Sequence, residues 1–155
     1  LMTNHAIEKI LKENDSALRK MLKSVNRKKE KEDKFFYLGK SYDIIINENI
    51  KRVYMEDNTI YTPSEKVLLK WLKDETIRIF DLEYVKVFNN FKEDIKSPIL
   101  KIRDMKTRWG VYNKKNHTIT LNSRLIEFDI DKIDYVIVHE LSHIKHFDHH
   151  RKCYQ

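Results

Sequence analysis

The chain has 155 residues, and 31 basic against 24 acidic side chains give it a formal net charge of +7. Hydrophobic residues make up 41% of it, which is enough to fill the core of one domain and excludes a disordered chain. No apolar run approaches the ~20 residues of a membrane helix. The single cysteine, Cys153, excludes an internal disulfide framework. We therefore expect a soluble cytoplasmic protein.

The positive charge has two interpretations. It is compatible with weak binding of nucleic acid or a nucleotide through a basic surface. However, the lysines are spread along the whole chain beside many Ile and Asn residues, a composition typical of AT-rich coding bias. We therefore favour an ordinary solvated surface.

The N-terminal segment is predicted to be a helix followed by a charged connector. Residues 5–25 carry one apolar stripe at helical spacing. Residues 27–34 lack that pattern and are all charged, so they form either a solvated connector or a basic arm for a polyanion; the three acids among them favour the connector. We assign residues 1–34 to this helix and connector, and residues 35–155 to the main domain.

The main domain is predicted to open with strands and one long helix. Aromatic and β-branched runs between Phe35 and Tyr61, separated by turn residues, predict a small antiparallel meander. Thr62 is then predicted as a helix N-cap, with Pro63 at the first helical position and Glu65 closing a capping box. We expect this helix to run to about Phe91.

A second set of strands and the last helix follow. A strand is predicted at Ile99–Met105, and then a hairpin of residues 109–113 and 118–122 around a turn at Lys114–His117. A short helix is expected near Ser123–Phe128. Asp129 or Asp131 can cap the last helix, whose apolar residues occupy most faces and so predict a core helix.

Within that core helix lies the run HELSH, residues 139–143. Side chains four apart lie on one face of a helix, so His139 and His143 can both point at one zinc ion. Glu140 is rotated away from direct ligation but can reach a metal-bound water as general base. The alternative is a pair of satisfied core histidines with an ion-paired glutamate. One metal explains three buried polar residues at once, whose burial would otherwise cost several kcal/mol.

The third ligand is chosen among three later histidines. His146 lies ~10 Å beyond His139 along a continuing helix and is explained by the helix dipole. His149 follows His143 by enough residues to turn back if the helix ends at Phe147–Asp148. We therefore predict His149, with His150 as second choice.

This run closes the longer segment DYVIVHELSH at 134–143, which Asp148-His149 follows, and two further segments accompany it: MKTRWG at 105–110 and ITLN at 119–122. Together with a weaker match at 38–42, they resemble the YgjP-like metallopeptidase family, related to the SprT- and WLM-type zinc peptidases of the zincin superfamily. The resemblance covers about Leu38 to the end. It implies one zinc ion per chain held by His139, His143 and His149, with Glu140 as catalytic acid/base.

The resemblance also sets the expected fold and substrate. We expect an α+β zincin-like domain: an antiparallel sheet packed on the long helix, with the HELSH helix beneath it. The strand at Thr118–Asn122 is a candidate edge for an extended peptide or protein substrate. Trp109 is expected in the core. Candidates for the oxyanion partner are Arg108, His150 and Tyr154.

Two departures from the family pattern are visible. His150 stands where a Ser commonly follows the third histidine, and Cys153-Tyr154 where a Phe-Trp pair stands. The family's final helix also continues further, so we expect either that it is truncated here or that the protein is short. Rival functions are a metal-dependent nucleotide phosphohydrolase and a non-catalytic, zinc-pinned nucleic-acid-binding module.

Overall fold

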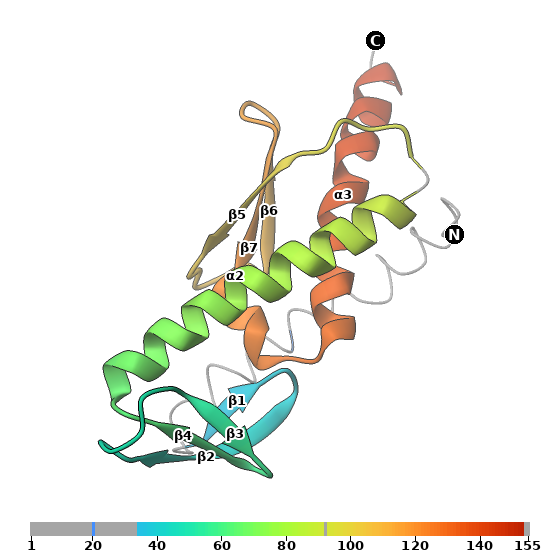
Figure 1. Ribbon diagram of the computed structural model, residues 1–155. Coiled ribbons are helices and arrows are strands. Elements are labelled where there is room, and N and C mark those ends of the chain that lie inside the picture. The colour runs from blue at the N-terminus through green and yellow to red at the C-terminus, as the bar shows by residue number, and fades with distance from the viewer. Residues whose placement is uncertain (1–19, 21–33, 92, 154–155) are drawn as a thin grey trace.

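The computed structural model describes Lys20, residues 34–91 and residues 93–153, and between 145 and 153 only the path of a helix. In Figure 1 the long helix α2 crosses the molecule between two separate sheets, and α3 packs against it. The predicted helix over residues 5–25 and connector over 27–34 fall almost wholly outside the described residues, so the division at residue 34 stays a prediction. In the described part, no helix is long and apolar enough to cross a membrane.

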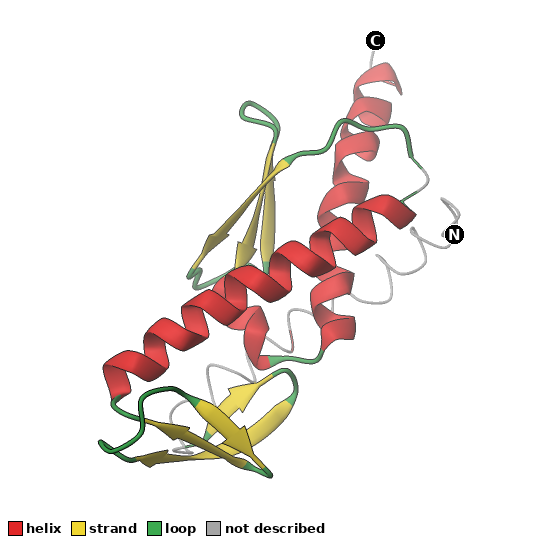
Figure 2. Cartoon of the chain, viewed as in Figure 1, coloured by secondary structure: helices red, strands yellow, loops and turns green. Residues whose placement is uncertain are grey.

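The class is α+β with mixed sheets, as the helices and strands in Figure 2 show. The first sheet has the order β1-β2-β4-β3 and the second the order β5-β7-β6. Their strands are β1 Phe35–Tyr37, β2 Lys40–Ile46, β3 Tyr54–Glu56, β4 Thr59–Thr62, β5 Ile99–Arg103, β6 Gly110–Asn113 and β7 Thr118–Asn122.

The predicted antiparallel meander is wrong in one pairing. β1–β2 and β3–β4 are antiparallel hairpins, but β2 pairs with β4 in parallel. The reason is burial. β4 carries the fully buried Ile60 and Thr62, whereas every residue of β3 is exposed. Placing β4 beside β2 buries the apolar strand and leaves β3 at the edge.

Helix α2, Glu65–Asn90, has its N-cap two residues later than predicted. Thr62 ends β4, and its hydroxyl donates to the Ser64 carbonyl at 2.8 Å. Ser64 is the N-cap, since its Oγ accepts the Val67 N–H at 3.2 Å. The assignment of Thr62 as cap was therefore wrong: strand pairing holds its backbone in the sheet. The predicted end is confirmed, because Phe91 is the C-cap.

The second sheet confirms the predicted hairpin and corrects its surroundings. β6 and β7 are antiparallel, with Gly110 opposite Leu121 and Asn113 opposite Thr118. β5 pairs with β7 in parallel, so the sheet is not purely antiparallel. β7 is therefore the central strand, and its prediction as a free edge was wrong. The free edges in this sheet belong to β5 and β6.

A 3₁₀ helix, η1 Ser123–Glu127, leads to α3, Ile130–Cys153, as predicted. Asp129 caps α3, because its Oδ1 accepts the Lys132 N–H at 3.1 Å. Residues of α3 supply much of the core, namely Ile133, Val136, Ile137, Val138, Leu141 and Ile144. The helix path continues to Cys153, so the expected helix end at Phe147–Asp148 is wrong.

Candidate metal centre

The two histidines of the HELSH run meet on one face of α3. Their Nε2 atoms lie 2.9 Å apart, with ring centroids at 4.5 Å and planes nearly perpendicular. Spacing by four residues on a helix produces this proximity. With Glu140, they form a group among the described residues whose ligand atoms all lie within 4.8 Å of one another.

This donor set fits a divalent metal ion. Two nitrogens bound to a tetrahedral zinc at ~2.0–2.1 Å are about 3.3 Å apart, close to the separation of the two Nε2 atoms. The present contact is a hydrogen bond between the rings, in which one Nε2 carries the proton. Metal binding requires both Nε2 lone pairs, and therefore both protons on Nδ1.

Glu140 lies close to this pair and is buried, with 5% of its surface exposed. Burial raises the pKa of its carboxyl group to about 7, while the positive charge of Arg108 and the backbone N–H of Tyr112 act in the opposite direction. The Tyr112 N–H donates its hydrogen bond to the carboxylate from β6. A carboxyl group with a pKa near neutrality is suited to general-base catalysis.

Gly110 permits the close approach of β6 to α3. A Cβ atom at this position would lie 2.9 Å from Glu140 Cγ and 3.0 Å from Val136 Cγ1. These separations are shorter than real Cβ atoms tolerate, so a larger residue would displace the helix or the strand. The glycine of the RWG motif thus positions the carboxylate.

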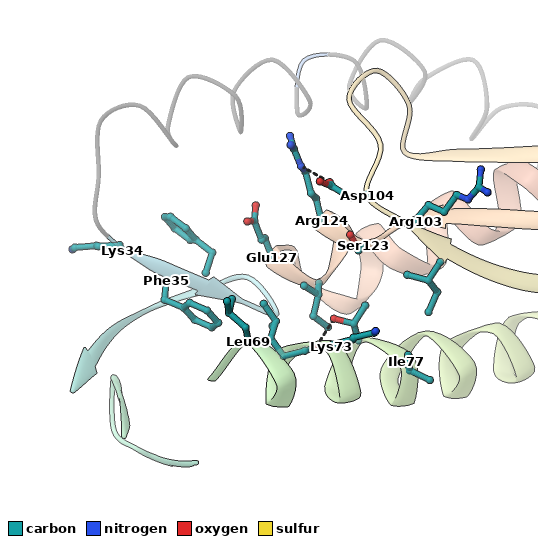
Figure 3. A pocket seen from close by; sticks show the side chains of 15 residues that line it. Lys34, Phe35, Leu69, Lys73, Ile77, Arg103, Asp104, Ser123, Arg124 and Glu127 are labelled. Atoms are coloured by element: carbon teal, nitrogen blue, oxygen red, sulfur yellow. Dashed lines mark hydrogen bonds and ion pairs between the residues drawn. The ribbon is translucent and has the colours of Figure 1, made fainter. Parts of the chain in front are cut away.

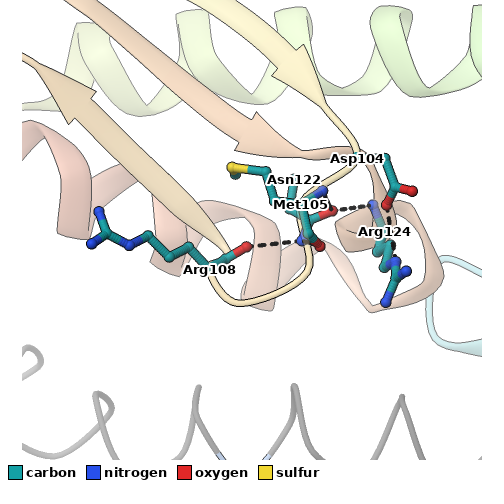
Figure 4. Close-up of polar contacts among 5 residues, drawn as sticks. All are labelled: Asp104, Met105, Arg108, Asn122 and Arg124. Carbon is teal, nitrogen blue, oxygen red and sulfur yellow. Dashed lines mark hydrogen bonds and ion pairs between the residues drawn. The ribbon is translucent and has the colours of Figure 1, made fainter.

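Asn122 organises the loop that carries Arg108 (Figure 4). Its buried side-chain amide donates to the carbonyls of Met105 at 2.9 Å and Arg108 at 2.8 Å. Its Oδ1 accepts the N–H of Arg124 at 3.1 Å and that of Met105 at 3.4 Å. The buried asparagine therefore holds both ends of the turn before β6.

Trp109 is confirmed as a core residue. It is 5% exposed and packs edge-on against Phe128, with ring centroids 5.1 Å apart. Its carbonyl accepts the Asn122 N–H at 2.9 Å. Trp109 anchors the loop from inside, while the side chain of its neighbour Arg108 is exposed.

The predicted third ligand is not tested. The side chains of His146, His149 and His150 and the whole of Tyr154 lie outside the described residues. The helix path through residue 149 nevertheless bears on whether His149 can reach the metal. On a continuous helix, position 149 lies ~9 Å beyond His143 along the axis. Ligation by His149 therefore requires the last turns of α3 to rearrange.

A cavity of about 650 Å³ lies elsewhere, between β1, α2, β5 and η1 (Figure 3). Its wall is apolar at Leu69, Leu72 and Ile126, and Lys34, Lys73 and Arg103 also line it. Neither the histidine pair nor Glu140 lines it. It is therefore separate from the candidate metal centre.

Sequence reasoning missed three contributors: Gly110, Tyr112 and Asn122. Two of them carried a usable signal. Gly110 is one of only two glycines, and Asn122 is a polar residue closing an apolar strand. Tyr112 acts through its backbone, which no side-chain pattern reports.

Comparison with known proteins supplies one match. The model of the family described as "YgjP-like, metallopeptidase domain" matches residues 1–155. The match includes residues 1–34, which the resemblance seen in the sequence does not reach. No curated protein and no solved structure matches the chain.

Proposed function

The chain belongs to the YgjP-like metallopeptidase family, and from this premise we propose that it is a zinc-dependent, zincin-like peptidase with Glu140 as general base. His139, His143 and His149 hold the metal in this proposal. The observation that carries it is the convergence of two Nε2 atoms, 2.9 Å apart, close to a buried carboxyl group. A structural role alone does not account for an acid buried close to two converging imidazoles.

Each residue has a separate task. A bound zinc ion would lower the pKa of a coordinated water and polarise the scissile carbonyl. Glu140 accepts a proton from the attacking water and returns it to the departing amine. The Tyr112 N–H and the Arg108 charge oppose the effect of burial, and the pKa of this carboxyl group is raised to about 7. Arg108, exposed beside the site, is the candidate that stabilises the developing oxyanion.

The substrate is an extended peptide that lies along β6. β6 is an edge strand of its sheet, and its Tyr112 N–H faces Glu140. A peptide approaching this edge would bring a carbonyl close to the carboxylate. β7 cannot serve, because strands occupy both of its sides.

Metal content and hydrolysis test the proposal together. His139→Ala and His143→Ala should lose zinc and stability, because a metal bound only to the folded state stabilises it. Glu140→Gln should keep zinc and lose hydrolysis of labelled casein. Equal loss of metal in all three variants would make Glu140 a ligand and refute the mechanism. Hydrolysis of nucleoside triphosphates without cleavage of casein would replace the peptidase with a phosphohydrolase.

The third ligand has its own test. His149→Ala should weaken zinc binding by about tenfold or more, as loss of one ligand does, while His146→Ala and His150→Ala serve as matched controls. A metal-bound structure should place a His149 nitrogen within about 2.3 Å of the ion. If His150 or His146 stands there instead, the assignment to His149 fails and the histidine pair remains.

A further inference from the structure

A chain of three hydrogen-bonded groups runs from the linker before β5 to the end of β6. His117 Nε2 lies 2.8 Å from the Lys96 carbonyl oxygen, and His117 Nδ1 lies 2.8 Å from the Tyr112 hydroxyl. A carbonyl oxygen only accepts, so Nε2 carries the proton. Nδ1 of the neutral ring is then the acceptor, and the Tyr112 hydroxyl donates to it.

The turn that carries His117 is itself held by the neighbouring strand. His117 has φ 49°, in the left-handed region, and its carbonyl accepts the Ile99 N–H at 3.0 Å. Its ring also meets the Tyr112 ring edge-on, with centroids 5.8 Å apart. Backbone, ring contact and hydrogen bonds together fix the Tyr112 side chain.

The same Tyr112 donates its backbone N–H to Glu140. Among the described strands, β6 pairs with β7 alone, so no strand of the described part fixes the twist of its outer side. Besides the pairing of Tyr112 with Ile119, the direction of the Tyr112 N–H therefore depends on what holds the tyrosine side chain. His117 holds it.

We propose that His117 is a positioning residue, which aligns the Tyr112 N–H with the Glu140 carboxylate. It touches neither the metal ligands nor the carboxylate in this role. The effect on turnover rests on the proposed peptidase function, but the alignment of the N–H does not. The two can therefore be measured separately.

The test uses the full chain loaded with zinc and four variants. His117→Ala removes both hydrogen bonds, Tyr112→Phe removes the hydroxyl, and His117→Gln keeps one donor and one acceptor. The matched control is Tyr84→Phe. The Tyr84 hydroxyl donates to the Pro98 carbonyl at 2.8 Å and so ties down the same linker without touching β6.

The first readout is amide hydrogen exchange of Tyr112, which needs no activity. Exchange should be about fivefold faster in His117→Ala and Tyr112→Phe, the effect of one lost hydrogen bond. His117→Gln should restore most of the protection, and Tyr84→Phe should leave it unchanged. Unchanged exchange in His117→Ala, or equal acceleration in Tyr84→Phe, would overturn the proposal.

The second readout is cleavage of labelled casein. His117→Ala should lower kcat by about fivefold, with KM and zinc content unchanged. Tyr84→Phe should keep kcat even where its melting temperature falls. Faster Tyr112 exchange with unaltered kcat would overturn the positioning role. A further outcome is that the wild-type protein cleaves no peptide while Tyr112 exchange is still faster in His117→Ala than in the wild type. That result would support the alignment by His117 and refute only the peptidase function.

Discussion

Replacing Gly110 by alanine tests whether the contact between β6 and α3 positions Glu140. The added Cβ would lie 2.9 Å from Glu140 Cγ, 3.0 Å from Val136 Cγ1 and 3.1 Å from Glu140 Oε1. The Cγ atoms sit close to the helix backbone and cannot swing away as a side-chain tip can. Either β6 or the Glu140 side chain must move by several tenths of an ångström.

The expected cost follows from overpacking. One extra methyl group in a well-packed core costs about 1–3 kcal/mol in the free energy of unfolding. Displacement of the general base should also lower kcat by about tenfold or more, since small misplacements of catalytic groups have large effects on rate. Zinc content should stay at the wild-type level, because the three atoms nearest to the new methyl group belong to Glu140 and Val136 and not to the histidine pair.

Urea unfolding, metal content and casein cleavage measure these effects, and Gly39→Ala is the matched control. Gly39 has φ 83°, so alanine there is strained, and its Cβ would lie 3.1 Å from Asp129 Cβ. This control should lose stability but retain kcat per folded molecule. A Gly110→Ala protein with wild-type kcat and stability within about 0.5 kcal/mol would refute the positioning of Glu140 by this contact.

Three further perturbations are predicted. Asn122→Ala should destabilise the fold by about 1–3 kcal/mol in urea unfolding, because the Met105 and Arg108 carbonyls lose the partner that joins them. Chelation of zinc should lower the melting temperature of the wild type but not that of His139→Ala. Asp134→Asn should change the pH dependence of stability. Burial and the neighbouring Glu83 carboxyl raise the pKa of Asp134 to about 7, against the opposing effect of Lys86 at 2.9 Å. The protonated form is therefore favoured in the folded state. Its contribution is complete below the ordinary pKa of about 3.9 and is lost as pH rises through 7. With a quarter of this side chain exposed, the variant should gain about 1–2 kcal/mol over the wild type between pH 5 and pH 8; a constant difference would contradict the shift.

Patterns among neighbouring residues predicted those features of the fold that depend on short-range contacts. The β6–β7 hairpin followed from alternation around a short turn, and the proximity of His139 and His143 from the helical repeat. The parallel pairings of β2 with β4 and β5 with β7 could not be predicted this way. They depend on where the chain crosses between strands, which neighbouring residues do not encode.

The N-cap of α2 is a second case in which neighbouring residues did not suffice for the prediction. Thr62 and Ser64 both have side chains that can cap a helix. The choice between them is made by β4, which extends through Thr62 and holds its backbone in the sheet. Tertiary pairing thus decides between two local patterns of similar strength.

The three family motifs lie next to one another in the fold. They are separated in sequence, yet the β6–β7 hairpin packs on α3 and brings them together. Asn122 of the second motif holds the loop of the first motif, whose Arg108 and Gly110 act on Glu140 of the third. Burial is the largest effect on the pKa of that carboxyl group, which is raised to about 7. The Arg108 charge and the Tyr112 N–H act in the opposite direction. With this pKa, about half of the carboxyl groups are ionised near pH 7 and can act as a base.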